Sequence, residues 1–65
     1  MYKYQIDCHN LNENEYNALI RRLDTSFTAT RYVADRIHTF HEEEPDEKKI
    51  RKTYGIPDQC SLRRL

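Results

Sequence analysis

Several residue types are scarce in this sequence of 65 residues: it has one glycine, two prolines, two cysteines and no tryptophan. A single glycine leaves no glycine-rich loop of the kind that holds phosphate groups at a helix N-terminus. The sequence also lacks a nucleophile-elbow motif and the two closely spaced ligand pairs that are typical of structural zinc sites. These absences argue against the nucleotide-binding, hydrolase and zinc-finger classes that a motif would reveal.

Long apolar runs are absent as well. No run approaches the ~20 residues that cross a bilayer, and the N-terminus has no basic region followed by an apolar core. We therefore expect a cytoplasmic protein with no membrane partner, in which Cys8 and Cys60 stay reduced. In an oxidising compartment the two cysteines would instead allow one disulfide.

Neither sign of charge is in excess. Eleven Lys and Arg residues balance eleven Asp and Glu residues, so the formal net charge is zero. A neutral chain argues against a general nucleic-acid binder and equally against an acidic mimic of DNA. The charges are nonetheless placed in blocks: residues 42–47 are mostly acidic, residues 48–52 are mostly basic, and Arg63 and Arg64 follow.

The length predicts one small domain spanning residues 1–65. Chains of this size bury only about 60% of the surface that the unfolded chain exposes, so the apolar residues suffice for one thin core. A thin core leaves no room for a deep, walled active site, and we expect neither enzymatic activity nor a cofactor. Self-association, as in a homodimer, is one way to complete so small a core.

Two elements are well specified by pattern. Residues 2–8 alternate strictly, with apolar residues at even positions and polar residues at odd ones, which predicts a half-buried strand. Asn12 and Glu15 have the spacing of a capping box. Tyr16, Leu19, Ile20 and Leu23 then share one helical face, so we expect a helix over residues 13–24.

Residues 27–44 admit two interpretations. The β-branched and aromatic composition favours a strand, whereas apolar residues recur with helical spacing, as at Val33, Ile37 and Phe40. We favour a helix. The alternative makes residues 28–40 a second strand, which would give the first strand a partner; without it, that partner must be residues 59–64 or a second chain.

The acidic start, basic end and Gly55 predict a short helix over residues 45–54, with Pro45 at its first position. The expected fold class is therefore α+β, a small single domain in which an N-terminal strand is followed by two or three helices. The alternative order is β-α-β-α, with residues 28–40 as the second strand.

One constellation has metal-ligand chemistry. His38, His41 and Glu42 would share a face if they lay on a helix, and Cys8, His9 and Cys60 would have to join them in space. Only the histidine pair has suitable spacing. We interpret His38 and His41 as solvated side chains on a polar helix face beside glutamates and predict no metal site.

A second pattern lies in residues 46–65, where an apolar residue is followed by Tyr-Gly-Ile and then by a polar stretch with a late leucine. This pattern resembles the core of the helix-turn-helix family of DNA-binding motifs. The resemblance implies a turn at Gly55, a second helix after it and phosphate contacts from Arg63 and Arg64.

The leading functional prediction is a non-enzymatic protein-binding regulator or inhibitor, of the kind that phage and mobile elements use to block a host protein by occlusion. Tyrosine and arginine are enriched at interface hot spots, and clustered charges orient a partner. The alternative is a small helix-turn-helix-like DNA-binding regulator using residues 46–65. The predicted partner-binding residues are Tyr2, Tyr4, Tyr32, Glu43, Glu44, Glu47, Lys48, Lys49, Arg51, Lys52, Arg63 and Arg64.

Overall fold

A computed structural model describes residues 1–24 and 30–65. Its elements follow one another as strand β1 (Tyr2–Asp7), helix α1 (Glu13–Asp24), strands β2 (Arg31–Ala34) and β3 (Ile37–Glu42), helix α2 (Glu47–Tyr54) and strand β4 (Ser61–Arg64). The α+β class is confirmed. The predicted strand over residues 2–8 and the predicted helix over residues 13–24 are also confirmed, the helix to the residue.

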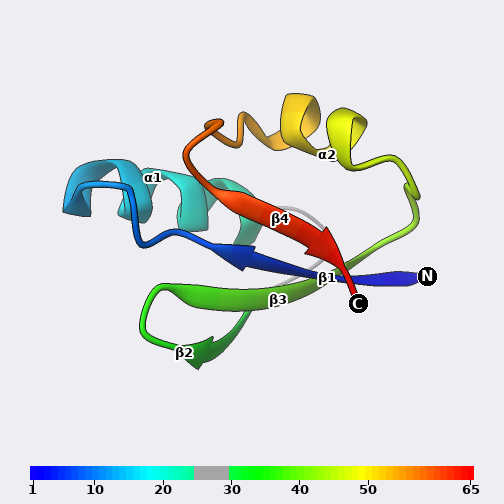
Figure 1. Ribbon diagram of the computed structural model, residues 1–65, viewed down its shortest axis with the longest axis horizontal. Helices are drawn as coiled ribbons and strands as arrows, with labels where there is room; N and C mark the ends of the chain where they lie inside the picture. The colour runs from blue at the N-terminus through cyan, green and yellow to red at the C-terminus, as the bar shows by residue number, and fades with distance from the viewer. Residues whose placement is uncertain (25–29) are drawn as a thin grey trace.

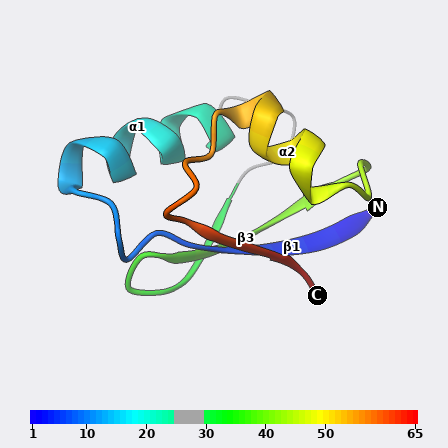
Figure 2. The same ribbon diagram turned by 45° about the horizontal axis from the view of Figure 1, so that its top comes forward.

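The four strands form one antiparallel sheet in the order β2-β3-β1-β4. This order, with the helices after β1 and β3, is the split β-α-β topology of ferredoxin-like domains. Both helices lie on one face of the sheet, which leaves the other face open in the described part of the chain (Figures 1 and 2). Topology alone does not assign a function.

The helix favoured over residues 27–44 is wrong. Residues 31–42 form the β2–β3 hairpin, and residues 25–29 lie outside the described part of the chain. The single strand considered over residues 28–40 was closer, but the chain reverses within it, at Asp35 and Arg36. Pairing with the central strand β1 stabilises β3. This stabilisation outweighs the preference for a helix that the spacing of the apolar residues indicates.

Arg36 fixes this reversal. Its φ is 60°, a left-handed conformation that non-glycine residues seldom adopt. Its carbonyl oxygen accepts a hydrogen bond from the Cys8 N–H at 2.8 Å, and its guanidinium donates to the Leu11 carbonyl at 2.6 Å. The turn is therefore held by Cys8 and Leu11, which lie near the N-terminus. Local sequence patterns do not reveal such contacts.

The second predicted helix exists, but it begins two residues later than expected. Asp46 is its N-cap, and the carboxylate accepts a hydrogen bond from the Lys48 N–H at 2.9 Å. Gly55 ends the helix in a left-handed conformation with φ 65°, as predicted from the sequence. The Ile56 N–H donates to the Arg51 carbonyl at 2.8 Å, which is typical of such a helix end.

The second helix implied by the helix-turn-helix pattern is wrong. Ser61–Arg64 form β4, which pairs with β1 in the register Ile6–Leu62 and Asp7–Ser61. An edge strand in this place completes the sheet on the side of β1 that faces away from β3.

The core lies between the sheet and the two helices. Tyr4 stacks on Phe40 with ring centroids 5.7 Å apart, and Ile6 and Leu62 continue this layer along the sheet. The buried apolar residues are Tyr4, Ile6, Cys8, Leu11, Leu19, Leu23, Phe40, Ile50, Ile56, Cys60 and Leu62. None of the helices in the described ranges has the length and apolar character needed to cross a bilayer.

The capping box of α1 is formed reciprocally. The Glu15 N–H donates to the Asn12 Oδ1 at 2.8 Å, and the Asn12 N–H donates to a Glu15 carboxylate oxygen at 3.1 Å. We expect Asn12→Ala to lower the free energy of unfolding by about 1 kcal/mol, because a backbone donor loses its partner. Urea denaturation followed by circular dichroism measures this, with Asn14→Ala inside the same helix as the control. An Asn12→Ala loss no larger than that of the control would contradict the role of the cap.

Candidate binding face of the sheet

The alternation of β1 divides its side chains between two environments. Tyr4 and Ile6 point into the core and are fully buried, so Lys3, Gln5 and Asp7 point to the other face of the sheet. This is the face that neither helix covers. The alternation that predicted the strand therefore also predicted which of its residues remain outside the core.

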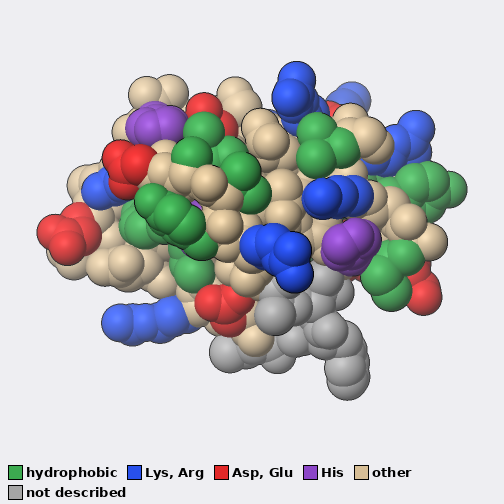
Figure 3. All heavy atoms as spheres, turned by 90° about the horizontal axis from the view of Figure 1, so that it is seen from below, with side chains coloured by type: hydrophobic (Ala, Val, Ile, Leu, Met, Phe, Trp, Pro, Cys, Tyr) green, Lys and Arg blue, Asp and Glu red, His purple; other side chains and the backbone are tan. Residues whose placement is uncertain are grey.

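Strand pairing brings residues from distant parts of the sequence to the same uncovered surface. In the register of the sheet, Lys3 lies opposite His41, Gln5 lies opposite both Thr39 and Arg63, and Arg31 lies opposite Thr39. We call this surface the open face; it includes Lys3, Gln5, Asp7, Arg31, Ile37, Thr39, His41, Ser61 and Arg63. Figure 3 shows lysine or arginine side chains beside a histidine near the middle of the molecule in a view from below.

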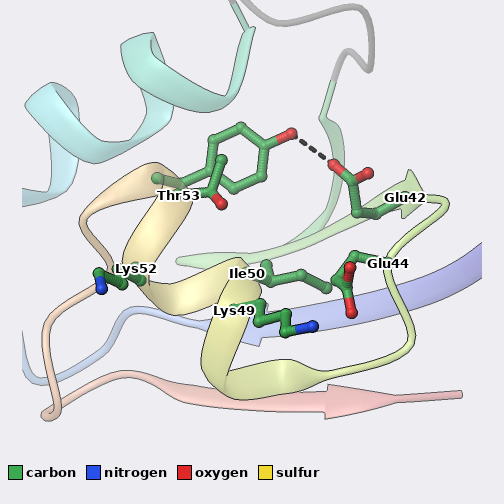
Figure 4. A pocket seen from close by; sticks show the side chains of 7 residues that line it. Glu42, Glu44, Lys49, Ile50, Lys52 and Thr53 are labelled. Atoms are coloured by element: carbon green, nitrogen blue, oxygen red, sulfur yellow. Dashed lines mark hydrogen bonds between the residues drawn. The ribbon is translucent and has the colours of Figure 1, made fainter.

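One hollow of the surface lies between α2 and the end of β3 and has a volume of about 570 Å³. Ile50 lies at its base, and the Tyr54 hydroxyl donates to a Glu42 carboxylate oxygen at 2.5 Å (Figure 4). Two acids, Glu42 and Glu44, and two bases, Lys49 and Lys52, line it. Because the signs balance within the hollow, it exerts little preference for a charged ligand of either sign.

A second hollow, of about 490 Å³, lies beside the start of α2 and is lined by Pro45, Asp46, Glu47, Lys48 and Arg64. It again combines two acids with two bases. The Arg64 N–H donates to a Glu47 carboxylate oxygen at 3.3 Å, and the Arg64 guanidinium lies over the Tyr2 ring, 4.8 Å from its centroid. The Arg64 guanidinium therefore already has a favourable partner within the molecule, the Tyr2 ring.

The hollow on the open face differs in its electrostatics. It has a volume of about 230 Å³ and is lined by Lys3, Arg31, Thr39 and His41, with no acidic residue of the described chain among them. Thr39 is only 6% exposed, so it lies at the base of the hollow. We call this hollow the cationic pocket.

The cations of the open face have no acidic partner in the described part of the chain. The ion pair found there joins His9 to Asp7, with 2.5 Å between Nδ1 and Oδ1, and it involves none of Lys3, Arg31 and Arg63. The sequence holds as many acids as bases, so a folded chain could have neutralised these groups. Lys3 on β1 and Arg63 on β4 lie on neighbouring strands, and Arg31 on β2 lies one strand beyond β3. An anionic ligand would be attracted by all three cations.

The predicted site residues are distributed over several surfaces. Tyr2 and Tyr32 are exposed, whereas Tyr4 is fully buried and cannot contact a partner in this fold. Arg51 donates to the Pro57 and Cys60 carbonyls at 3.1 and 2.8 Å, so it holds the loop before β4. Glu43, Glu44, Glu47, Lys48, Lys49 and Lys52 lie on α2 or just before it, away from the open face.

Only Arg63 of the predicted set belongs to the open face. Lys3, Arg31 and His41 were missed, because each is an isolated charge within a strand and none belongs to a charged block. The alternation of residues 2–8 gave a partial signal for Lys3. No local pattern could show that β1, β2 and β3 would bring the three side chains together.

The strand structure separates the histidines of the metal hypothesis. His38 and His41 are three residues apart, a spacing that places them on one face of a helix but on opposite faces of a strand. His38 is buried on the core side, and His41 lines the cationic pocket. In the described ranges no three His, Cys, Asp or Glu side chains are placed to hold a metal ion.

His38 gives the fold a dependence on pH. Burial lowers the pKa of its imidazole below the ordinary value of 6.5, although the charge of Asp24 opposes this shift. Tyr16 Oη lies 2.6 Å from Nε2, and the buried Nδ1 has no hydrogen-bond partner among the described residues. The neutral ring is therefore the form that the native structure accommodates.

Because the unfolded chain binds a proton at His38 more readily than the folded one, stability should fall as the pH drops below 6.5. One proton contributes a slope of at most about 1.4 kcal/mol per pH unit. Urea denaturation at several pH values measures this slope for the native protein and for His38→Gln, with His41→Gln at an exposed position as the control. An unchanged slope in His38→Gln would contradict the assignment.

Cys8 and Cys60 lie beside each other in the core, and both are free thiols. Burial raises the pKa of Cys8 to about 12, and the neighbouring Cys60 thiol contributes to this rise. Burial also raises the pKa of Cys60. The native thiols are thus protonated at neutral pH and have little nucleophilic reactivity.

Comparison of the sequence with protein-family models finds no match, and comparisons with curated proteins and with solved structures find none either. The evidence for the function of the chain is therefore the charge distribution and geometry of its own surface.

Proposed function

We propose that the chain is a non-enzymatic binding protein of the cytoplasm whose open face covers an acidic surface of a cognate or host protein. The observation that carries the proposal is the cationic pocket, which has basic residues and no described acid in its lining, while the two hollows beside α2 are balanced. Complementary charge favours encounter with an acidic surface and disfavours basic ones.

The composition of the open face favours a protein partner over a nucleic acid. Four-stranded sheets of this topology that bind RNA stack bases on aromatic residues of the sheet. Here the outward positions of the two central strands hold Lys3, Gln5, Asp7, Ile37, Thr39 and His41, with no Tyr or Phe among them. Stacking on aromatic rings contributes about 1–3 kcal/mol per base, and His41 is the one aromatic ring among these six positions.

The margins of the sheet add area suited to a protein interface. Tyr32 and Val33 of the edge strand β2 are 64% and 54% exposed, and Tyr2 at the start of β1 is 41% exposed. Aromatic residues at such places bring rigid contact area together with a polar end. We therefore assign partner contact to the open face first and to these margins second.

The proposal is tested by a pair of matched charge reversals. One double variant, Lys3→Glu with Arg31→Glu, reverses two charges on the open face. The other, Lys48→Glu with Lys49→Glu, reverses two charges on α2. All four side chains are exposed in the native chain. Proteins captured from a lysate by the native chain are identified by mass spectrometry, and the dissociation constant of each is then measured for the native chain and both variants.

We expect the open-face variant to bind its partner at least about tenfold more weakly, a loss of about 1.4 kcal/mol, and the α2 variant to bind nearly as the native chain does. The reverse ranking would move the interface to α2 and contradict the proposal. Tighter binding of single-stranded RNA or duplex DNA than of any protein would also contradict it. With three permanent cations, the slope of log K against log salt for nucleic acid should be no steeper than about −3.

A further inference from the structure

The cationic pocket has the dimensions and donors of a site for one small charged group. Its volume of about 230 Å³ is below the range of roughly 300–1,000 Å³ that pockets for drug-sized ligands occupy. A whole metabolite would therefore project into solvent, whereas a single acidic group would be surrounded by the lining side chains.

Four potential donors meet in the pocket, and they come from three adjacent strands. Lys3 of β1 faces His41 of β3, and Arg31 of β2 faces Thr39 of β3. The two pairs are neighbours because Thr39 and His41 are two residues apart and share one side of β3. The sheet therefore fixes the Cα positions of these four residues before a ligand binds.

The chemistry of these side chains selects an oxyanion. The guanidinium of Arg31 is planar and offers paired N–H groups that match two oxygens of a carboxylate or a phosphoryl group. Lys3 supplies a point charge, the Thr39 hydroxyl supplies a short donor at the base, and His41 offers a ring nitrogen at the wall. Cations of this kind attract an anion without having to leave an internal ion pair, because no ion pair of the described residues involves Lys3 or Arg31.

We propose that the cationic pocket is a subsite for a single oxyanion, a carboxylate or a phosphoryl group carried by a side chain of the partner. This inference rests on the proposed function in one respect, namely that a partner protein carries the oxyanion. Binding of the oxyanion in the pocket does not depend on the proposed function. Arg31 and Lys3 supply the attraction, and Thr39 with His41 orients the oxygens.

The subsite is tested on the isolated chain by nuclear magnetic resonance. Amide and His41 ring signals are followed while sodium phosphate or sodium acetate replaces sodium chloride at constant ionic strength and pH. We expect saturable shifts confined to the pocket, with a dissociation constant of ~1–10 mM for the better anion. Arg31→Gln and Lys3→Gln should each weaken binding at least about fivefold, whereas Lys49→Gln on α2 should not.

A second titration with two short peptides of the same sequence, one bearing glutamate and the other phosphoserine, identifies the source of the oxyanion. Tighter binding of either peptide at the pocket supports the subsite and names its group. Shifts that do not saturate, or that persist unchanged in both Arg31→Gln and Lys3→Gln, would overturn it.

The two proposals can fail separately. If neither anion binds in the pocket but the open-face charge reversals abolish partner capture, the subsite is overturned and the binding face stands. If an anion saturates the pocket but the charge reversals leave partner capture intact, the subsite stands and the proposed function is overturned.

Discussion

A disulfide between Cys8 and Cys60 is expected to raise the free energy of unfolding by about 4 kcal/mol, because it closes a loop of about 50 residues in the unfolded chain. The two residues are placed for this bond. The β1–β4 register pairs Asp7 with Ser61, so its continuation by one residue sets Cys8 opposite Cys60. Both side chains are buried, at 0% and 2% exposure, and each thiol influences the pKa of the other.

The bond should form during folding and not in the native state. The raised pKa values keep the native thiols protonated, and their burial excludes an oxidant. During refolding with oxidised glutathione, one thiolate attacks the glutathione disulfide and the second displaces the bound glutathione, which leaves the protein disulfide and two molecules of reduced glutathione. In a reducing cytosol the pair remains as thiols.

The measurement compares urea denaturation of the chain refolded with oxidised glutathione and of the chain kept in reductant. Intact mass after thiol alkylation verifies the oxidation state, and Cys60→Ser treated in the same way provides the control. We expect a higher midpoint for the oxidised native chain alone. Failure to form an intramolecular disulfide, or an oxidised form no more stable than the dithiol, would contradict the predicted juxtaposition.

Phe40→Ala is expected to lower the free energy of unfolding by about 3–5 kcal/mol, the largest loss expected of a single substitution in this core. Phe40 is 2% exposed, stacks on Tyr4 and packs edge-to-face against Tyr54 with centroids 6.2 Å apart. Truncation of a buried phenylalanine costs about 3–5 kcal/mol, and a domain of this length is stabilised by only about 3–10 kcal/mol. The single substitution thus removes a large part of the total.

Phe40→Leu gives a measurable intermediate because it keeps much of the apolar volume, and we expect it to cost about 1–2 kcal/mol. Circular dichroism and urea denaturation report both variants, with Val33→Ala on the exposed edge of β2 as the control. An Ala variant with native-like stability would show that the Tyr4–Phe40 layer is not the centre of the core.

The fold changed the expected contact surface from the charged blocks near α2 to the open face of the sheet. Formal neutrality argued against a polyanion-binding surface, yet the charges are segregated once the chain folds. The acids of residues 42–47 lie before and at the start of α2, while Lys3, Arg31 and Arg63 share the open face. The charged blocks that drew attention in the sequence turn out to be locally balanced.

The sequence by itself determined β1 and α1. Their signals, the alternation of residues 2–8 and the capping box of Asn12 and Glu15, are made of residues close together in the chain, and local geometry suffices to satisfy them. Gly55 likewise determined the end of α2, because its left-handed φ stops a helix wherever the helix lies.

Only the tertiary structure decided that residues 31–42 form a hairpin and that residues 61–64 form a strand. Strands β3 and β4 both pair with β1, which lies far from them in the sequence, and that pairing outweighs weak local preferences. Strand β2 then pairs with β3, its neighbour in the hairpin. The open face was decided in the same way, because a surface assembled from several strands exists only after the strands have paired.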